Sequence, residues 1–452
     1  MSPRSEKWRV GILLGVAVAV WSGNLAQRRA HLAEDRDGYR QIAQNLCETH
    51  TYARTLPDGT RCATAYRPPL YPLLLALSGG WRGVTSTTIA ILHLILLGLV
   101  LVTMYLIGRS ISSTTGLIAA GIMAVDPLLL HWSAYPMTET LSTLFGAALL
   151  GATQLAWNRL EHHSSGSAVS RRRDTVALVA WGLLAGLATL CRPVFAVWSA
   201  ALIAATLFRP ARRGLVVPTC LMAAAMALTL LPWTLRNATT VGRATPLTTH
   251  GGYTLLLGNN PLFYDHLQSG GWRTVWDAET LRPWLADRGA AASPPCDAEP
   301  ANDRQCYELA RQSIRSAPKW FIISSLLRVV RLWSPLPHRL SEDESVLRRT
   351  ARWSIGLWYT GLYGAAAFGL LGLSASGARH RRLSDARSLS KLLASPLLMT
   401  GLIGIASFTI VHAFYWSNMR MRAPLTPWIA LAAAVAIEQM TRGPIARRHR
   451  KE

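Results

Sequence analysis

Three acidic residues, Glu34, Asp35 and Asp37, stand close together just after the first apolar segment of the chain. A carboxylate in a polar loop can act as a general base. It can equally cap a helix, because the apolar spacing that begins at Tyr39 predicts a short helix over residues 37–47 and an acid there satisfies free backbone N–H groups. Spacing alone leaves both interpretations open.

A further acid, Glu139, stands at the predicted mouth of a later apolar segment. A glutamate in that position is expected to face protein or water rather than lipid, which makes it a candidate functional residue. The alternative is a favourable charge at a helix N-terminus, with the preceding Thr138 as the cap.

Four arginines are predicted at the same ends of apolar segments: Arg67, directly before two prolines, Arg236, Arg420 and Arg422. Any one of them alone is typical of an arginine that extends to lipid headgroups. Together with the acids they suit a lipid substrate that carries phosphate, since guanidinium groups pair with phosphate through two parallel hydrogen bonds.

Composition identifies the setting of these residues. The chain has 452 residues, of which 50% are hydrophobic and 16% are charged. Several apolar runs reach the roughly 20 residues that a bilayer requires, which predicts an all-α polytopic membrane protein. The net charge of +23 fits retention of basic loops in the cytoplasm and attraction to anionic membrane lipids. No basic and aromatic module typical of nucleic-acid binding is present, so we expect no nucleic-acid partner.

We expect about ten spans, with both chain ends in the cytoplasm because the basic clusters alternate accordingly. The first apolar segment resembles a signal peptide, but we expect an uncleaved span. The predicted spans are 8–26, 88–108, 115–130, 139–157, 176–190, 194–208, 215–231, 354–372, 392–411 and 425–440. The expected organisation is a catalytic membrane module (1–232, with an outer loop over 27–87), an extracytoplasmic loop (233–318), and an interfacial helix followed by the last spans (319–452).

The two outer loops hold cysteines and one notable histidine. Cys47 and Cys62 share the first loop, and Cys296 and Cys306 share the second, so each pair can form a local disulfide or remain as unrelated thiols. His250, which precedes two glycines, is a candidate metal ligand or donor, although a lone loop histidine is more often neither.

A series of segments in order along the chain resembles the GT-C glycosyltransferases that use polyprenyl-phosphate sugars, the superfamily of the protein O-mannosyltransferases and the lipid A aminoarabinose transferase. The matching segments are Asp35-x-x-x-Tyr39-x-x-x-Ala43-x-Asn45-Leu46, Arg67-Pro-Pro-Leu-Tyr-Pro72, Pro127…Thr138-Glu139, Gly186-Leu-Ala…Cys191-Arg192-Pro193, Pro232-Trp-x-x-Arg-Asn237, Gly258-Asn-Asn-Pro261 and Arg420-Met-Arg-Ala-Pro-Leu-x-Pro427.

The resemblance implies a GT-C fold in the plasma membrane and transfer of a sugar to a lipid, glycan or protein acceptor on the outer face. It implies that Asp35 is the base of an inverting displacement or, with Glu139, the holder of a divalent metal. It places Arg67 at the donor phosphate, where the aminoarabinose enzymes carry a lysine. Tyr66 replaces the glutamate that those enzymes have next to that lysine, which argues against a metal site using that glutamate.

We expect Arg236, together with Arg420 or Arg422, to assist Arg67. Further candidates from the matched segments are Tyr39, Asn237 and Asn259, and Asp37 is expected to be the helix cap. The alternatives are a flippase or other transporter of lipid-linked sugars, which requires no acid pair and is expected to show internal repeats, and an accessory protein that binds lipid.

Overall fold

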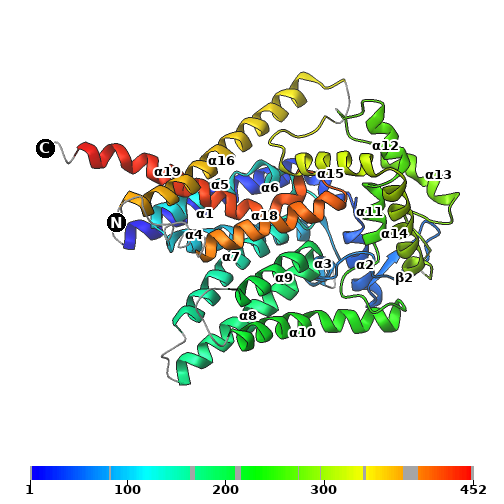
Figure 1. Cartoon of the computed structure of the whole chain (residues 1–452), viewed down its shortest axis with the longest axis horizontal. Helices are drawn as coiled ribbons and strands as arrows, with labels where there is room; N and C mark the ends of the chain where they lie inside the picture. Colours follow the sequence, from blue (N-terminus) through cyan, green and yellow to red (C-terminus); the bar gives the residue numbers. More distant parts are fainter. Residues whose placement is uncertain are drawn as a thin grey trace.

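A computed structural model describes residues 3–80, 83–162, 168–208, 215–272, 274–295, 297–339, 343–379 and 395–448. Long helices form an elongated bundle with both termini at one end (Figure 1). The helices of the bundle are α1 (Pro3–Gln27), α4 (Ser86–Arg109), α5 (Ser113–Ala124), α6 (Pro127–Trp132), α7 (Glu139–His162), α8 (Ala168–Cys191), α9 (Val194–Leu207), α10 (Val216–Thr240), α16 (Val346–Arg379), α18 (Pro396–Phe414) and α19 (Thr426–Arg448).

Shorter elements gather at the opposite end, which we call the polar end (Figure 1). They are η1 (Arg29–Ala33), α2 (Tyr39–Thr49), β1 (Ala53–Thr55), β2 (Arg61–Ala63), α3 (Leu70–Gly79), α11 (Gly251–Leu257), α12 (Pro261–Gln268), η4 (Ala278–Thr280), α13 (Leu281–Ala286), α14 (Glu299–Ser316), α15 (Pro318–Trp333) and η5 (Met419–Leu425). The two strands pair in an antiparallel hairpin with Ala53 opposite Ala63. The short helix predicted over 37–47 is confirmed as α2.

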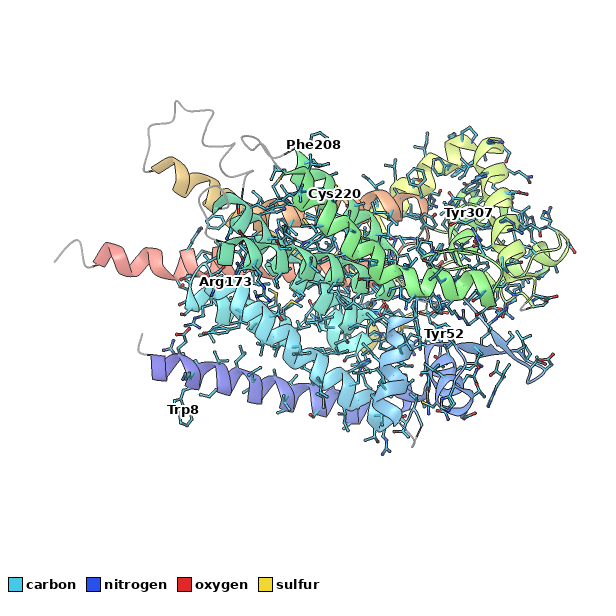
Figure 2. All side chains as sticks on the ribbon, turned by 90° about the horizontal axis from the view of Figure 1, so that it is seen from below. Trp8, Tyr52, Arg173, Phe208, Cys220 and Tyr307 are labelled. Atoms are coloured by element: carbon cyan, nitrogen blue, oxygen red, sulfur yellow. The ribbon has the colours of Figure 1, made fainter. Side chains whose placement is uncertain are left out.

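Six described segments are long and apolar enough to cross a membrane: Ser5–Gln27, Ser86–Arg109, Arg172–Cys191, Val216–Thr240, Pro396–Phe414 and Met419–Thr441. The expected number of about ten is therefore not confirmed and stays a prediction. So does the predicted division into three regions. Outward-facing apolar side chains such as Trp8 and Phe208, which are 74% and 82% exposed, give the bundle a surface suited to lipid (Figure 2).

Two predicted spans differ from the structure. The span expected over 115–130 is broken into α5 and α6, because Pro127 has no N–H to continue a helix and Asp126 starts α6 by accepting from the Leu129 amide at 3.0 Å. The span expected to end at residue 231 instead continues through Pro232 as α10 to Thr240. Residues predicted to begin an outer loop therefore lie on the last turns of a helix.

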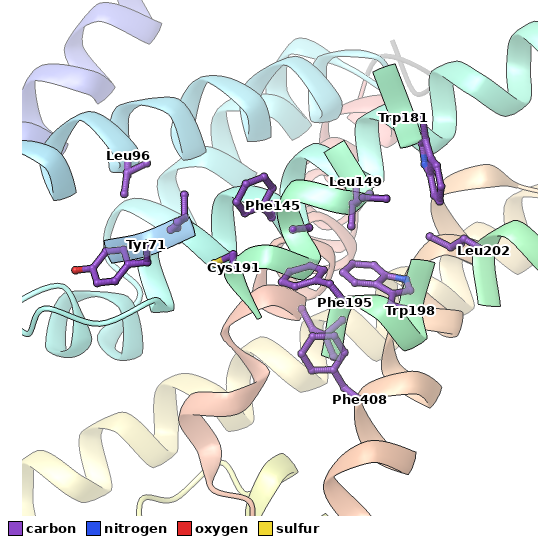
Figure 3. Close-up of a cluster of buried hydrophobic side chains, with 14 of the residues drawn as sticks. Tyr71, Leu96, Phe145, Leu149, Trp181, Cys191, Phe195, Trp198, Leu202 and Phe408 are labelled. Atoms are coloured by element: carbon purple, nitrogen blue, oxygen red, sulfur yellow. The ribbon is translucent and has the colours of Figure 1, made fainter. Parts of the chain in front are cut away.

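Aromatic packing holds the centre of the bundle together (Figure 3). Phe195 and Trp198 of α9 stack with ring centroids 5.7 Å apart, and Phe408 of α18 meets Trp198 edge to face at 5.9 Å. Phe145 of α7 meets Phe195 at 6.4 Å. All except Phe145, which is 8% exposed, are fully buried. Burial of rings of this size stabilises the relative placement of α7, α9 and α18, the helices whose ends form the site described next.

Neither of the two possible disulfide pairs, Cys47–Cys62 and Cys296–Cys306, is formed. Cys47 and Cys306 are free thiols, whereas Cys62 is in a disulfide. The thiol of Cys47, on α2, instead lies 3.6 Å from the carbonyl oxygen of Ala76, on α3. Sharing a loop therefore did not identify which cysteines lie within bonding distance.

Candidate active site

A cavity of about 340 Å³ lies at the polar end, where the first loop meets the starts of α7 and α9, the end of α18 and the η5 turn. One part of its wall is apolar and the rest is charged or polar. The charged and polar lining includes Asp37, Arg67, Thr138, Arg192, His250 and Arg420.

Asp37 lies between two guanidinium groups at the cavity wall. Arg67 donates to its Oδ1 at 3.1 Å and, from Nε, to its backbone carbonyl at 2.8 Å. Arg420 lies 3.5 Å from Oδ2. Burial alone would raise the pKa of this carboxyl, but Arg67 and Arg420 outweigh burial and hold the pKa of Asp37 below its ordinary value. The cavity therefore presents an ionised carboxylate with a cation on each side.

Asp35 has a different task. Its Oδ1 accepts from the amide of Arg40 at 3.0 Å and its Oδ2 from the amide of Gln41 at 2.7 Å, so it caps α2. Burial raises the pKa of Asp35, although these two hydrogen bonds oppose the rise. The expectation that Asp37 is the cap is therefore wrong, and Asp35 is not among the residues that line the cavity.

Glu139, the first residue of α7, is 1% exposed and lies behind the cavity. Arg192 donates to its Oε1 at 2.7 Å and, from Nε, to Thr138 Oγ1 at 2.8 Å. The Nε of Arg420 is 3.7 Å from the same Oε1. Within the described residues its Oε2 has no hydrogen-bond partner. Glu139 thus holds two of the arginines that face the cavity.

The charged residues form an alternating series of three cations and two anions: Arg67, Asp37, Arg420, Glu139 and Arg192. The series carries one net positive charge. The three guanidinium groups share only two carboxylates, so they can still attract a further anion in the cavity. The site is therefore suited to a phosphate group.

Aromatic side chains close another wall. The rings of Tyr66 and His250 lie 4.0 Å apart, and Tyr253 stacks on His250 at 5.2 Å. Burial lowers the pKa of His250 well below its ordinary value, so the ring is neutral at physiological pH. Tyr66 donates to the Ala292 carbonyl at 2.9 Å, and burial raises its pKa to about 12. Its ring also faces the Arg67 guanidinium, 5.1 Å away.

Two predicted phosphate-binding arginines lie elsewhere. Arg236 donates to the carbonyls of Thr64 and Tyr52 at 2.6 and 2.8 Å and so attaches α10 to the first loop. Arg422 donates to the carbonyls of Leu332 and Ser334 at 3.0 and 2.6 Å. Neither lines the cavity, because both are committed to backbone oxygens.

The two candidate asparagines are also bound to the protein itself. Asn237 donates to the Thr245 carbonyl at 2.9 Å and fixes the turn after α10. Asn259 donates to the Phe414 carbonyl at 2.8 Å and accepts from Arg328 at 3.2 Å. Of the other candidates, Tyr39 does line the cavity.

The described residues do not fit a resident divalent metal. Both oxygens of Asp35 are bound by backbone amides, and Glu139 is bound by Arg192. The cavity carboxylate, Asp37, has an arginine on each side, whose positive charges oppose a cation. Across the described ranges, no three histidine, cysteine or acidic side chains converge on a common point.

Arg192 is a cavity residue that the candidate set lacked. It stands where Pro193 ends α8 and α9 begins, which directs its side chain from the helix break toward Glu139. The sequence signal that could have identified it is the Cys191-Arg192-Pro193 segment, which is one of the segments that carry the family resemblance. Trp416 and Tyr415 also line the cavity and had no sequence signal.

Comparisons with known proteins concern the fold of the chain. Residues 66–235 match the family described as dolichyl-phosphate-mannose-protein mannosyltransferase. No curated protein matches the chain. Among solved structures, the archaeal oligosaccharyltransferase AglB from Archaeoglobus fulgidus, in complex with an inhibitory peptide and a dolichol-phosphate, is similar with a TM-score of 0.53 and 18% identity. The match covers 98% of this chain and 52% of that chain.

Two more solved structures are similar. The A. fulgidus oligosaccharyltransferase in complex with Zn and sulfate has a TM-score of 0.50 at 15% identity, over 96% of this chain and 50% of that chain. ArnT from Cupriavidus metallidurans bound to undecaprenyl phosphate has a TM-score of 0.40 at 13% identity, over 95% of this chain and 77% of that chain. The chain therefore spans about half the length of the oligosaccharyltransferases that it matches.

The similarity to the oligosaccharyltransferase structures confirms the predicted fold class. The chain is an integral, multi-pass membrane protein with the GT-C fold.

Proposed function

We propose that this chain is a glycosyltransferase that takes a sugar from a polyprenyl-phosphate donor and passes it to an acceptor on the extracytoplasmic face of the plasma membrane. The observation that carries the proposal is the convergence of Arg67 and Arg420 on Asp37 at the wall of a cavity large enough for a sugar phosphate. The family match over residues 66–235 supports the same donor class.

Arg67 and Arg420 are the donor-phosphate ligands in this proposal. Both guanidinium groups face the cavity, and both already bind a carboxylate in a geometry that a phosphate oxygen can replace. Arg192, which donates to Thr138, supplies a third cation at the cavity. Positive charge fixed in advance stabilises the negative charge that develops on a departing phosphate.

The apolar wall suits the lipid part of the donor. Val194 and Val197 at the start of α9 and Val411 near the end of α18 line the cavity. Val197 is also 42% exposed, so the cavity wall at this point is open rather than buried. A prenyl chain can therefore run from the membrane along α9 while its phosphate reaches the arginines.

Asp37, rather than Asp35, is the proposed base, because it is the aspartate that faces the cavity. An acceptor hydroxyl or amine attacks C1 of the sugar, the C1–O bond to phosphate breaks with its electron pair leaving on the polyprenyl phosphate, and the acceptor proton passes to Asp37. This single displacement inverts C1. Donor phosphate draws Arg67 and Arg420 away from Asp37, which raises the proton affinity of the carboxylate when it is needed.

Glu139 acts as a positioning residue. It is 1% exposed and does not line the cavity, but it binds Arg192 directly and lies 3.7 Å from Arg420. Its proposed task is to keep these two arginines at the phosphate position.

Turnover of the donor tests the proposal. The purified full chain in vesicles would be supplied with a panel of polyprenyl-phosphate hexoses and pentoses, with native membranes as the acceptor source, and released polyprenyl phosphate would be measured by mass spectrometry. We expect turnover by the wild type, a loss of roughly 10²–10⁴-fold in Asp37→Asn, and less than about tenfold loss in Asp35→Asn, because asparagine also caps helices.

Wild-type turnover in Asp37→Asn would contradict the assignment of the base. Failure of the wild type to release polyprenyl phosphate from any donor in the panel would contradict the function itself. A thermal unfolding curve for each variant separates loss of chemistry from loss of fold.

A further inference from the structure

A second cavity, of about 440 Å³, lies beside the first at the polar end. Its lining is almost wholly charged and comes from α14 and from the segment that follows α10: Arg243, Arg304, Tyr307, Glu308 and Arg311. Three arginines against one glutamate leave the lining with an excess of two positive charges. The mechanism proposed above uses none of these residues.

The arginines differ in how they are held. Arg243 donates to Asp303 at 2.6 Å, and Asp303, which is 1% exposed, also accepts from the Gly252 amide at 2.7 Å. This arrangement fixes Arg243 on a buried partner. Arg304 and Arg311 are seven residues apart and therefore lie on the same face of α14. Both are exposed, and neither forms an ion pair within the described part of the chain. Two cations are thus available to a ligand beside a third that is fixed in place.

Tyr307 joins the two cavities, since its side chain lines both of them. Its hydroxyl is 3.4 Å from that of Tyr415, which also lines the first cavity. The close approach of α11 to α14 requires glycine: a Cβ at Gly252 would lie 2.1 Å from the Asp303 carbonyl oxygen, and one at Gly251 would lie 2.2 Å from the Tyr307 hydroxyl. Helix α14, including the Tyr307 side chain, therefore packs directly against α11 beside the two cavities.

The second cavity also lies near the membrane boundary. Arg243 follows the segment Val216–Thr240, one of those long and apolar enough to cross the bilayer, after a short turn. Groups at this level meet lipid headgroups before they meet bulk solvent.

We propose that the second cavity binds a phosphate group of a membrane-anchored acceptor, and that Tyr307 marks the path from this group to the reaction centre. The inference rests on the proposed transferase function, because it supplies the acceptor side of the same reaction. An acceptor held by its phosphate at Arg243, Arg304 and Arg311 extends its hydroxyl or amine past Tyr307 toward Asp37. The acceptor class is then an anionic lipid-linked compound rather than a neutral one.

Binding measurements test this site separately from the donor site. The probe for the second cavity is dioctanoyl phosphatidic acid, and the probe for the donor site is undecaprenyl phosphate, each added to the purified full chain in neutral nanodiscs. The test variant is Arg304→Gln with Arg311→Gln, in which both changed side chains are exposed. The control variant is Arg288→Gln with Arg315→Gln, which removes the same charge from exposed positions outside the cavity.

We expect the test variant to lose at least about tenfold in affinity for dioctanoyl phosphatidic acid and to keep its affinity for undecaprenyl phosphate, while the control variant keeps both. Unchanged phosphatidic acid binding in the test variant, or an equal loss in the control variant, would overturn the second site. Equal binding of glycerol 3-phosphate, which has the same headgroup without chains, would overturn the membrane-anchored acceptor. If the wild type does not bind undecaprenyl phosphate, the result would instead contradict the proposed function.

Discussion

The pKa values of the two aspartates of the first loop, Asp35 and Asp37, are shifted in opposite directions, although only Arg36 separates the two residues. Asp37 has its pKa lowered because Arg67 and Arg420 outweigh the effect of burial. Asp35 has its pKa raised by burial, against the two amide hydrogen bonds that it accepts. Gly38, with a φ of +75°, turns the chain between Asp37 and the first turn of α2.

Acid unfolding distinguishes these environments. The pKa of Asp37 is lower in the folded chain than the ordinary value of about 3.9. Its ion pairs therefore stabilise the fold above that value, and the contribution is lost as the pH falls below it. We expect Asp37→Asn to unfold more easily than the wild type at pH 7, by roughly 1.5–3 kcal/mol, and the difference to shrink toward pH 3.

Tryptophan fluorescence during thermal unfolding of the solubilised protein measures this difference at each pH. Asp287→Asn serves as the control, because the Asp287 side chain is exposed and forms no hydrogen bond or ion pair within the described residues. A difference between wild type and Asp37→Asn that stays constant from pH 7 to pH 3 would show that the Asp37 ion pairs do not contribute to stability.

At the scale of elements, the site depends on how closely η5 approaches α7. A Cβ at Gly146 of α7 would lie 1.9 Å from the carbonyl oxygen of Pro424. On the same face, Thr143 donates to the Ala423 carbonyl at 3.2 Å. Because η5 carries Arg420, this helix contact sets the distance of Arg420 from Asp37.

Gly146→Ala is therefore expected to displace η5, since the clash is with backbone. We predict a loss of at least about tenfold in donor turnover and a destabilisation of roughly 1–3 kcal/mol. Gly98→Ala on α4 is the matched control, because a Cβ there meets no atom within 4 Å and alanine favours a helix. If turnover of Gly146→Ala equalled that of Gly98→Ala, Arg420 placement would not depend on this contact.

Hydropathy and helix signals predicted most of the elements. The short helix α2 follows directly from local apolar spacing, and the helix expected at the start of the region 319–452 is present as α15. The break between α5 and α6 was missed, although Asp126-Pro127 is an ordinary helix start, because the apolar pattern runs on across it. The end of α10 was missed because the apolar run ends at residue 231, whereas the helix continues through Pro232 into the polar segment that follows.

The site was only partly predictable. Arg67, Arg420, Tyr39 and His250 were found by residue type and position, and all four line the cavity. The choice between Asp35 and Asp37 depends on the direction of one loop, which motif spacing does not encode. Arg236 and Arg422 have the same charge as the cavity arginines and similar positions at the ends of apolar segments. Their partners, however, are backbone carbonyls from distant parts of the chain, which the sequence does not reveal.

At the scale of the whole molecule, the chain places charge and lipid-facing surface in separate regions. Exposed apolar side chains cover the bundle, while both cavities lie at its polar end. The wall of the first cavity combines both kinds of side chain, because partly exposed apolar residues such as Val197 line it together with Arg67. This geometry suits a substrate with a long apolar chain and a charged head.

The most direct test of the account is to locate a bound donor lipid. Undecaprenyl phosphate carrying a diazirine near its phosphate would be cross-linked to the full chain in vesicles, and the labelled peptides would be identified by mass spectrometry. We predict labels at the start of α9 around Val194 and Val197 and at the end of α18 around Val411, with competition by undecaprenyl phosphate but not by undecaprenol. Labels confined to the outer surfaces of α1 and α16, or equal competition by undecaprenol, would contradict the account.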